Sequence, residues 1–194
     1  MKRFVIVVDT QGDFMLPDGA LAVAGADALI APMRDWLAAL SPDDTAGVLF
    51  TFDTHHEDVY PLSPEGQEFP IHCVRGTPGW DNVLDPALVP AGIPVWRLEK
   101  GVFDMWAEDG VMIEPLAGGA AIGRERFFNE LKDRGVTAVT VIGVAADYCV
   151  KWTVEGLVER GFSVTVPQAL TRGIHRPIEQ VRAEEFAPES LTLA

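Results

Sequence analysis

Five short, strongly apolar runs recur along the chain, and most of them are unbroken by polar residues. They cover residues 4–8, 47–52, 94–98, 136–142 and 162–166. Continuous apolar runs of this length are typical of parallel strands, because both faces of such strands are covered by helices. The pattern therefore predicts five buried strands.

Three segments between or after these runs carry apolar residues at helical spacing. The helices predicted from this spacing cover residues 26–40, 124–134 and 148–160. Strands that alternate with helices form right-handed βαβ units, which pack helices on both faces of a sheet. We therefore predict one domain over residues 1–194, with a three-layer α/β/α fold around a mostly parallel central sheet.

Two long segments show no such periodicity. Residues 55–92 contain six prolines together with histidines and aromatic residues, and residues 101–123 are rich in glycine and aromatic residues. Loops of this length are uncommon in a compact domain and are usually functional when they are ordered. We therefore predict that residues 55–92 form a ligand-binding excursion from the sheet and that residues 101–123 form a lid.

The composition is that of an ordinary globular domain. The chain has 194 residues, of which 48% are hydrophobic and 23% are charged, so one sizeable core can form. The formal net charge of −14 argues against nucleic acid as a partner, because such binding depends on Lys and Arg that neutralise phosphates. No apolar run approaches the ~18 residues of a membrane span, so no membrane association is expected.

The N-terminal apolar run is interpreted as a strand rather than as an export signal. It is only five residues long, it ends at Asp9, and no small-residue cleavage site follows at a fitting distance. A cytoplasmic location is therefore expected, in which the two cysteines of the chain, Cys73 and Cys149, stay reduced.

Reactive side chains follow four of the predicted strands. They are Asp9 after the first strand, Asp53 and His55 after the second, Lys100 after the third and Cys149 after the fourth. In an open parallel sheet, ligands bind outside the carboxyl ends of the strands, which share one edge. The sequence therefore predicts that a thiol, an ammonium group and carboxylates come together at this edge.

Cys149 lies where a helix is predicted to begin. The free N–H groups and the partial positive charge of a helix N-terminus lower the pKa of a thiol and can hold an oxyanion. A nucleophilic thiol also needs a base and a nearby cation, roles that suit Asp9 and Lys100. Taken singly, each residue has a structural interpretation as well: a buried core cysteine, a turn-capping aspartate and a solvated lysine.

A second group, formed by Asp53, His55 and His72, has the composition of a metal site. In an extended Asp-x-His segment both side chains point to the same face, and two imidazoles with a carboxylate suit Zn²⁺ or a similar divalent ion. His72 lies 17 positions after His55, so only a returning loop can bring it close. The alternative is that these are ordinary loop histidines.

Several motifs of the chain resemble those of one protein family. They are DTQGDF at residues 9–14, DTH at residues 53–55, FPIHCVRGTPG at residues 69–79, KG at residues 100–101 and GVAADYCV at residues 143–150. In combination they are similar to the motifs of the nicotinamidase branch of the isochorismatase-like cysteine hydrolases. The resemblance extends from residue 4 to about residue 167.

The resemblance implies a catalytic triad of Asp9, Lys100 and Cys149. It also implies an oxyanion hole formed by the N–H groups of Ala145 and Cys149, with a cis peptide bond before Ala145 that aims them. The expected substrate-binding side chains are Phe14, Tyr148, Trp80 and Trp106, with core packing as the alternative for the two tryptophans.

For the metal site, the resemblance implies Asp53, His55 and His72 as ligands. Glu65, in a Pro-Glu dipeptide before the second histidine, is a candidate fourth ligand. Zn²⁺ is the expected cofactor, with Fe²⁺ and Mn²⁺ as alternatives.

The implied function is the hydrolysis of nicotinamide, or of a similar small carboxamide, to the acid and ammonia through a thioester on Cys149. Two departures from the family pattern bear on the substrate: residues 102–106 replace an aromatic-serine segment, and Gln168 stands where an acidic residue is common. One alternative is a metal-independent hydrolase of a ureido or carbamoyl C–N bond. Another is a non-catalytic member that binds a small ligand. The expected partner is a small-molecule amide, and a homo-oligomer remains an option.

Overall fold

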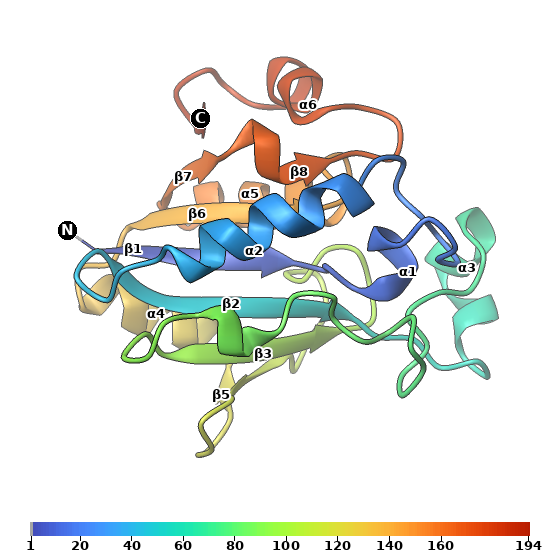
Figure 1. The fold of residues 1–194 in the computed structure, drawn as a ribbon, viewed down its shortest axis with the longest axis horizontal. Helices are drawn as coiled ribbons and strands as arrows, with labels where there is room; N and C mark the ends of the chain where they lie inside the picture. Colours follow the sequence, from blue (N-terminus) through green and yellow to red (C-terminus); the bar gives the residue numbers. More distant parts are fainter. Residues whose placement is uncertain (1) are drawn as a thin grey trace.

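The computed structural model describes residues 2–194, which form a nine-stranded sheet with helices on both faces (Figure 1). The strand order is β5-β4-β3-β2-β1-β6-β7-β9, and β8 pairs with β6. The strands are β1 (Arg3–Val8), β2 (Thr45–Asp53), β3 (Val95–Lys100), β4 (Met112–Pro115), β5 (Ile122–Gly123), β6 (Ala138–Val144), β7 (Ser163–Val166), β8 (Thr171–Arg172) and β9 (Leu191–Leu193). The α-helices are α1 (Gly12–Met15), α2 (Ile30–Ala38), α3 (Pro64–Glu68), α4 (Arg124–Asp133), α5 (Cys149–Glu159) and α6 (Ile178–Glu185). Short 3-10 helices are η1 (Asp27–Leu29), η2 (Tyr60–Leu62), η3 (Pro86–Leu88) and η4 (Gln168–Leu170).

The predicted three-layer fold is confirmed. Each of the five predicted strands coincides with a strand of the sheet, namely β1, β2, β3, β6 and β7, and these strands pair in parallel. The three predicted helices coincide with α2, α4 and α5. The first is shorter than predicted, because residues 27–29 form the 3-10 helix η1 before α2 begins.

The segment of residues 101–123, predicted to be a lid, is partly sheet. It contains β4 and β5, which extend the sheet in antiparallel fashion beyond β3. These strands are only four and two residues long, so they carry too little alternation to be seen in the sequence. The 55–92 excursion likewise contains η2, α3 and η3 rather than one continuous loop.

Strand β1 divides the apolar core into its two layers. Phe4, Ile6 and Val8 pack in the cluster that contains the inner faces of α4 and α5, whereas Val5 and Val7 pack in the cluster that contains α2. All five side chains are fully buried. An apolar residue is therefore required at each of positions 4–8 of β1, since both faces of this part of the strand are covered.

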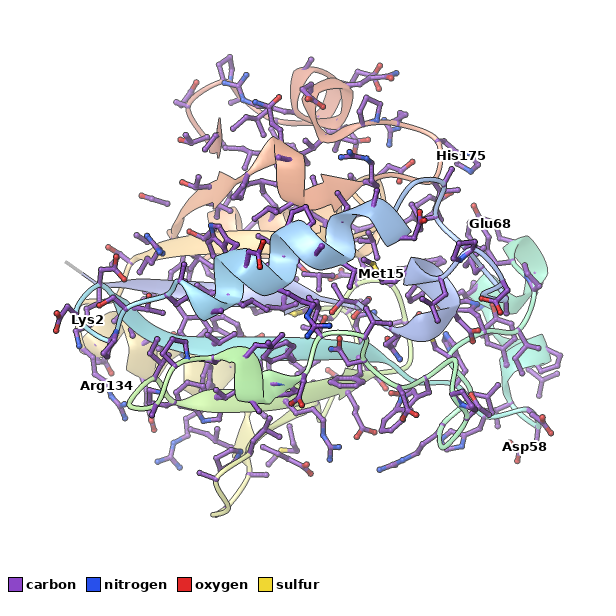
Figure 2. The ribbon with its side chains drawn as sticks, in the orientation of Figure 1. Lys2, Met15, Asp58, Glu68, Arg134 and His175 are labelled. Atoms are coloured by element: carbon purple, nitrogen blue, oxygen red, sulfur yellow. The ribbon has the colours of Figure 1, made fainter. Side chains whose placement is uncertain are left out.

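The carboxyl ends of β1, β2, β3 and β6 lie at one edge of the sheet, at the end of the molecule that carries α1 and α3 (Figure 1). Figure 2 shows Asp58 and Glu68, two residues of the 55–92 excursion, at this end, and Lys2 and Arg134 at the opposite end. The excursion therefore covers the edge at which the reactive residues were predicted to meet.

The close approach of β1 and β6 at this edge requires a glycine. Gly143 has a φ of +120°, and a Cβ atom at this position would overlap the carbonyl oxygen of Val8. Val8 and Gly143 form the last pair between the two strands. The contact brings Asp9, which follows Val8, to the same place as the turn that leads to Cys149.

No helix among residues 2–194 is long and apolar enough to cross a lipid bilayer.

Replacing Phe4 by alanine is expected to lower the free energy of unfolding by about 3–5 kcal/mol. The ring is fully buried and packs against the rings of Trp96 and Phe127, with centroids at 5.9 and 5.7 Å. Urea denaturation measures the change. Leu62→Ala is the control, because Leu62 is 81% exposed, and it should alter stability by less than about 0.5 kcal/mol. Equal effects of the two substitutions would contradict the assigned core.

Candidate active site

Lys100 lies at the centre of a cluster of reactive side chains. Its Nζ atom lies 2.8 Å from Oδ2 of Asp9, 3.3 Å from Oδ1 of Asp53 and 3.6 Å from Sγ of Cys149. None of the four side chains is more than 2% exposed. The structure thus brings together the thiol, the ammonium group and the carboxylates that the sequence places at the strand ends.

The charge of Lys100 is maintained by its neighbours. Burial alone lowers the pKa of a lysine, but the negative charges of Asp53 and Asp9 outweigh burial and hold the pKa of Lys100 well above its usual value. Lys100 is therefore a permanent cation beside the thiol.

Asp9 is oriented by its backbone and by β2. It has a φ of +47°, a left-handed conformation that Asp tolerates better than most residues. Its Oδ1 atom accepts a hydrogen bond of 2.6 Å from the hydroxyl of Thr51, which leaves Oδ2 directed at Lys100. Thr51 could not be singled out from the sequence, because a threonine inside a buried strand is ordinarily a packing residue.

The thiol of Cys149 is held in its neutral form. Burial raises its pKa well above the ordinary value, and the charges of Asp9 and Asp53 and a hydrogen bond to Asp9 add to this effect, while Lys100 opposes it. The net direction is thus opposite to the lowering expected from a helix N-terminus, because burial dominates. Nucleophilic attack by Cys149 requires transfer of its proton, and Asp9 is the hydrogen-bonded carboxylate.

The turn before α5 offers backbone N–H groups. The peptide bond between Val144 and Ala145 is cis, as the family resemblance implied. The N–H groups of Ala146, Tyr148 and Val150 donate to backbone carbonyls. Among the described hydrogen bonds of this turn, none uses the N–H group of Ala145 or Cys149, so both can donate to a ligand.

A second cluster adjoins the first and consists of Asp53, His55, Glu65 and His72. Oδ2 of Asp53 lies 3.2 Å from Nε2 of both histidines, and Oε1 of Glu65 lies 3.5 and 3.3 Å from the same two atoms. One ligand atom from each residue falls within 4.8 Å of all the others. All four residues are buried, so the arrangement could hold a divalent metal ion with nitrogen and oxygen donors.

The orientation of His72 fits this interpretation. Its Nδ1 atom lies 2.8 Å from the carbonyl oxygen of Pro70. A carbonyl only accepts hydrogen bonds, so Nδ1 carries the proton and Nε2 can present its lone pair to a metal ion. Both carboxylate oxygens of Glu65 are buried, and Oε1 has only the long contacts to the two histidines, which is the state of a ligand that a cation would satisfy.

The buried carboxylates of Asp53 and Glu65 are stabilised by positive charge close to them. Burial lowers the pKa of a histidine, but hydrogen bonds to Asp53 and Glu65 outweigh burial and raise the pKa of His55 to about 8 and that of His72 to about 9. A divalent ion supplies the same compensation by direct coordination, in competition with these protons.

Three aromatic rings meet beside the nucleophile. Tyr148, the residue before Cys149, packs at ring distances of 5.3 Å from Phe69 and 5.1 Å from Phe103, which in turn lie 5.6 Å apart. The hydroxyl of Tyr148 donates to Glu68 at 2.9 Å. Sequence reasoning named Tyr148 but missed Phe69 and Phe103, because aromatic residues in irregular segments have no periodicity to reveal where they pack.

Phe14 and Trp80, which were also predicted to bind substrate, contact different neighbours. Phe14 is buried with its ring 5.1 Å from that of His72, next to the metal cluster. Trp80 packs on Phe52 at 5.3 Å, and its Nε1 atom donates to the hydroxyl of Thr54. Both residues therefore lie near the end of β2.

Trp106 has the contacts of a packing residue. Its ring lies 4.8 Å from that of Phe128 in α4, and its Nε1 atom donates to the carbonyl oxygen of Thr153 in α5. The guanidinium group of Arg160 lies 3.9 Å from the ring centroid, a cation–π contact. These contacts anchor the 101–111 segment to two helices, and they give no support to a substrate-binding role for Trp106.

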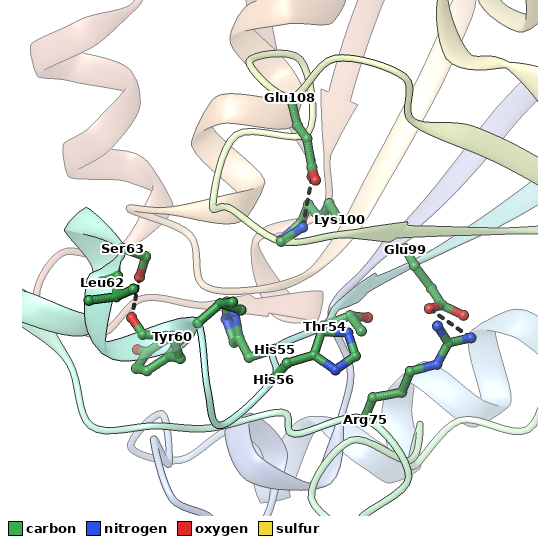
Figure 3. Close-up of a pocket in the computed structure, with 12 residues that line it drawn as sticks. Thr54, His55, His56, Tyr60, Leu62, Ser63, Arg75, Glu99, Lys100 and Glu108 are labelled. Carbon is green, nitrogen blue, oxygen red and sulfur yellow. Dashed lines mark hydrogen bonds and ion pairs between the residues drawn. The ribbon is translucent and has the colours of Figure 1, made fainter.

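A cavity of about 500 Å³ opens beside the two clusters. Figure 3 shows His55 and Tyr60 on one wall, Lys100 on another, and the ion pair of Arg75 and Glu99 at the rim. Its volume is in the range of small-molecule sites. Most of the lining residues come from segments 55–92 and 101–123, which were predicted to be functional, and the others lie at the ends of β2 and β3.

Comparison with known proteins gives the same assignment. The isochorismatase domain family matches residues 3–188. A nicotinamidase/pyrazinamidase of Mycobacterium tuberculosis is 33% identical over 98% of this chain and 97% of its own length. Among solved structures, pyrazinamidase of Pyrococcus horikoshii in complex with zinc has a TM-score of 0.74 and 26% identity, and it covers 100% of this chain and 99% of its own. PnC1 from L. infantum in complex with nicotinate has a TM-score of 0.73 and 26% identity, with 100% and 92% coverage.

The fold and the family match define an α/β protein of the isochorismatase type, and the chain belongs to the isochorismatase family. Within this family it belongs to the nicotinamidase branch and is an amidohydrolase, as the sequence motifs implied.

Removing one histidine from the metal cluster is expected to weaken metal binding. His72→Ala deletes a donor atom, so the dissociation constant for Zn²⁺ should rise by more than the ~10–100-fold that follows loss of an outer-shell partner. Competition with a chromogenic chelator measures it. His56→Ala is the matched control, because His56 follows a cluster member in the chain but is exposed. Equal affinity of the His72→Ala variant and the unaltered protein would refute the site.

Proposed function

We propose that this protein hydrolyses nicotinamide, or a closely similar small carboxamide, to the acid and ammonia. The proposal draws on the nicotinamidase relatives and on the nicotinate complex of the L. infantum protein. The observation that carries it is that Asp53 belongs to both clusters. Its Oδ1 atom contacts Lys100 while its Oδ2 atom faces the two histidines, so a ring held at the metal cluster lies next to the thiol.

In the first half of the reaction, Asp9 accepts the proton of Cys149 and the sulfur attacks the amide carbon. Lys100 compensates the charges of Asp9 and of the sulfur as the proton moves. The N–H groups of Ala145 and Cys149 hold the oxyanion; losing one such donor typically raises the barrier by ~3–4 kcal/mol.

The C–N bond then breaks. Asp9 gives its proton to the leaving nitrogen, which departs as ammonia, and the acyl group remains on Cys149 as a thioester. In the second half, Asp9 accepts a proton from water as the water oxygen attacks the thioester. The C–S bond breaks, the acid is released, and the proton returns to the sulfur, which restores the starting state.

We propose Zn²⁺ as the metal ion, held by Asp53, His55, Glu65 and His72. The donor set suits zinc, and the P. horikoshii relative was solved in complex with zinc. When bound, the ion supplies a positive centre that a ring nitrogen or water can coordinate. The rings of Phe14 and Tyr148 flank the site and restrict how a planar substrate lies.

The alternative of a metal-independent hydrolase of ureido or carbamoyl bonds is less well supported. Four convergent, buried ligand residues have no purpose in such an enzyme, since burying two carboxylates together is costly unless a cation compensates them. The alternative of a non-catalytic member gains no support from a thiol, ammonium and carboxylate in mutual contact.

Cys149→Ala is expected to abolish ammonia release from nicotinamide while the protein stays folded, because the variant lacks the nucleophile but loses little volume. Ammonia and nicotinate are measured together, and circular dichroism checks the fold. Cys73→Ala removes the other cysteine of the chain and should keep most of the activity. Full activity of Cys149→Ala would exclude the thioester route.

Asp9→Asn is expected to lower kcat by about 10²–10⁴-fold, the usual contribution of a general acid–base. The amide retains the size of the carboxylate and an acceptor for Thr51, but it cannot take the proton of the thiol. Asp27→Asn, at an exposed position in η1, is the control and should have unaltered kinetics. A kcat within threefold of the unaltered enzyme for Asp9→Asn would assign the base elsewhere.

A further inference from the structure

The end of β2 lacks a strand partner on one side. The pairing of β1 with β2 ends at Val7 and Phe50, whereas β2 continues to Asp53. On its other side Asp53 pairs in register with Lys100 of β3. The backbone of Asp53 would therefore present a buried N–H and C=O toward the place that β1 has left, and buried backbone groups need partners.

The side chain of Gln11 occupies this place. Its Oε1 atom accepts the N–H group of Asp53 at 2.7 Å, and its Nε2 atom donates to the carbonyl oxygen of Asp53 at 2.8 Å. The carboxamide thus makes the pair of hydrogen bonds that a neighbouring strand would make. The second hydrogen of Nε2 is donated to the carbonyl oxygen of Trp80 at 2.9 Å.

Gln11 is fully buried, and both N–H donors and the carbonyl acceptor of its amide are in use. A glutamine at such a position has little freedom to shift, since any movement leaves at least one buried group without a partner. The main chain of Asp53 is thereby fixed at the point where its side chain begins.

We propose that Gln11 is a positioning residue for the metal site and for Lys100. It fixes the backbone of Asp53, and Asp53 directs one carboxylate oxygen to the ammonium group and the other to the metal cluster. The inference rests on the proposed function, because it concerns the same site. It extends that proposal to a residue that touches neither substrate nor metal ion.

Gln11→Met tests the proposal, because methionine has a similar length and shape but makes none of the three hydrogen bonds. The dissociation constant for Zn²⁺, measured by chelator competition, is expected to rise by about 10–100-fold, as for other residues that orient a metal ligand. At saturating Zn²⁺ the variant should still show a lower kcat, since the contact of Asp53 with Lys100 is also displaced. A folded Gln11→Met protein with a dissociation constant within twofold of the unaltered protein overturns the proposal.

Two controls separate positioning from general destabilisation. Gln180→Met makes the same chemical change at an exposed glutamine of α6, whose side chain donates to Glu184, and should leave Zn²⁺ affinity unchanged. Phe4→Ala lowers stability at a remote core position and should also leave the affinity unchanged. A loss of affinity in Phe4→Ala equal to that in Gln11→Met would show that the effect is general and would overturn the proposal.

Gln11→Asn serves if Gln11→Met does not fold. The shorter amide remains polar but cannot span both backbone groups of Asp53, so the dissociation constant for Zn²⁺ should rise at least tenfold; an unchanged value in this folded variant overturns the proposal. Zn²⁺ affinity is read without any substrate. If the unaltered protein binds Zn²⁺ but does not hydrolyse nicotinamide, the proposed function fails while the comparison at Gln11 still stands.

Discussion

A charged lysine buried inside the protein is the constraint on which the site depends. Taking an ammonium ion out of water costs on the order of several kcal/mol, so Lys100 is tolerated only because Asp9 and Asp53 lie within 3.3 Å of its Nζ atom. Each carboxylate in turn relies on the lysine. The ends of β1, β2 and β3 are therefore joined by charge as well as by backbone pairing, and the site cannot be loosened at one strand without affecting the others.

The surroundings of Cys149 also keep its thiol protonated, and therefore weakly reactive, before substrate binds. Burial, together with the charges of Asp9 and Asp53, outweighs the effect of the Lys100 ammonium group on the pKa of Cys149, so the neutral thiol is the favoured form. Oxidation of cysteine follows thiolate character and exposure, and Cys149 is only 2% exposed. The arrangement thus restricts reactivity to the moment when a substrate is in place and the proton moves to Asp9.

Sequence patterns were sufficient for the central layer of the fold and for the meeting of Asp9, Lys100 and Cys149, because buried parallel strands read as apolar runs and share a carboxyl edge. They were insufficient where contacts depend on irregular chain. Phe69 and Phe103 come from segments without periodicity, and Trp106 gave no sign of whether it faced ligand or core. Glu65 was suggested only by family resemblance, since nothing in its spacing linked it to His55.

The sequence patterns also did not reveal a short edge strand, or a side chain that makes the hydrogen bonds of a missing strand. β9, three residues long, lies in a tail that carried no signal. Gln11 was visible as part of a motif, but its role depends on where β1 stops relative to β2. That offset is set by the packing of the whole sheet and cannot be derived from either strand alone.

The members of the two clusters differ in how widely they are separated along the chain. The candidate metal ligands all come from residues 53–72, whereas Asp9 directly follows β1 and Cys149 begins the helix that follows β6, and β1 and β6 are neighbouring strands in the middle of the sheet. The metal donors therefore lie within one short stretch of chain, whereas the acid comes from well before this stretch and the sulfur from well after it. Turnover consequently needs contributions from widely separated parts of the chain.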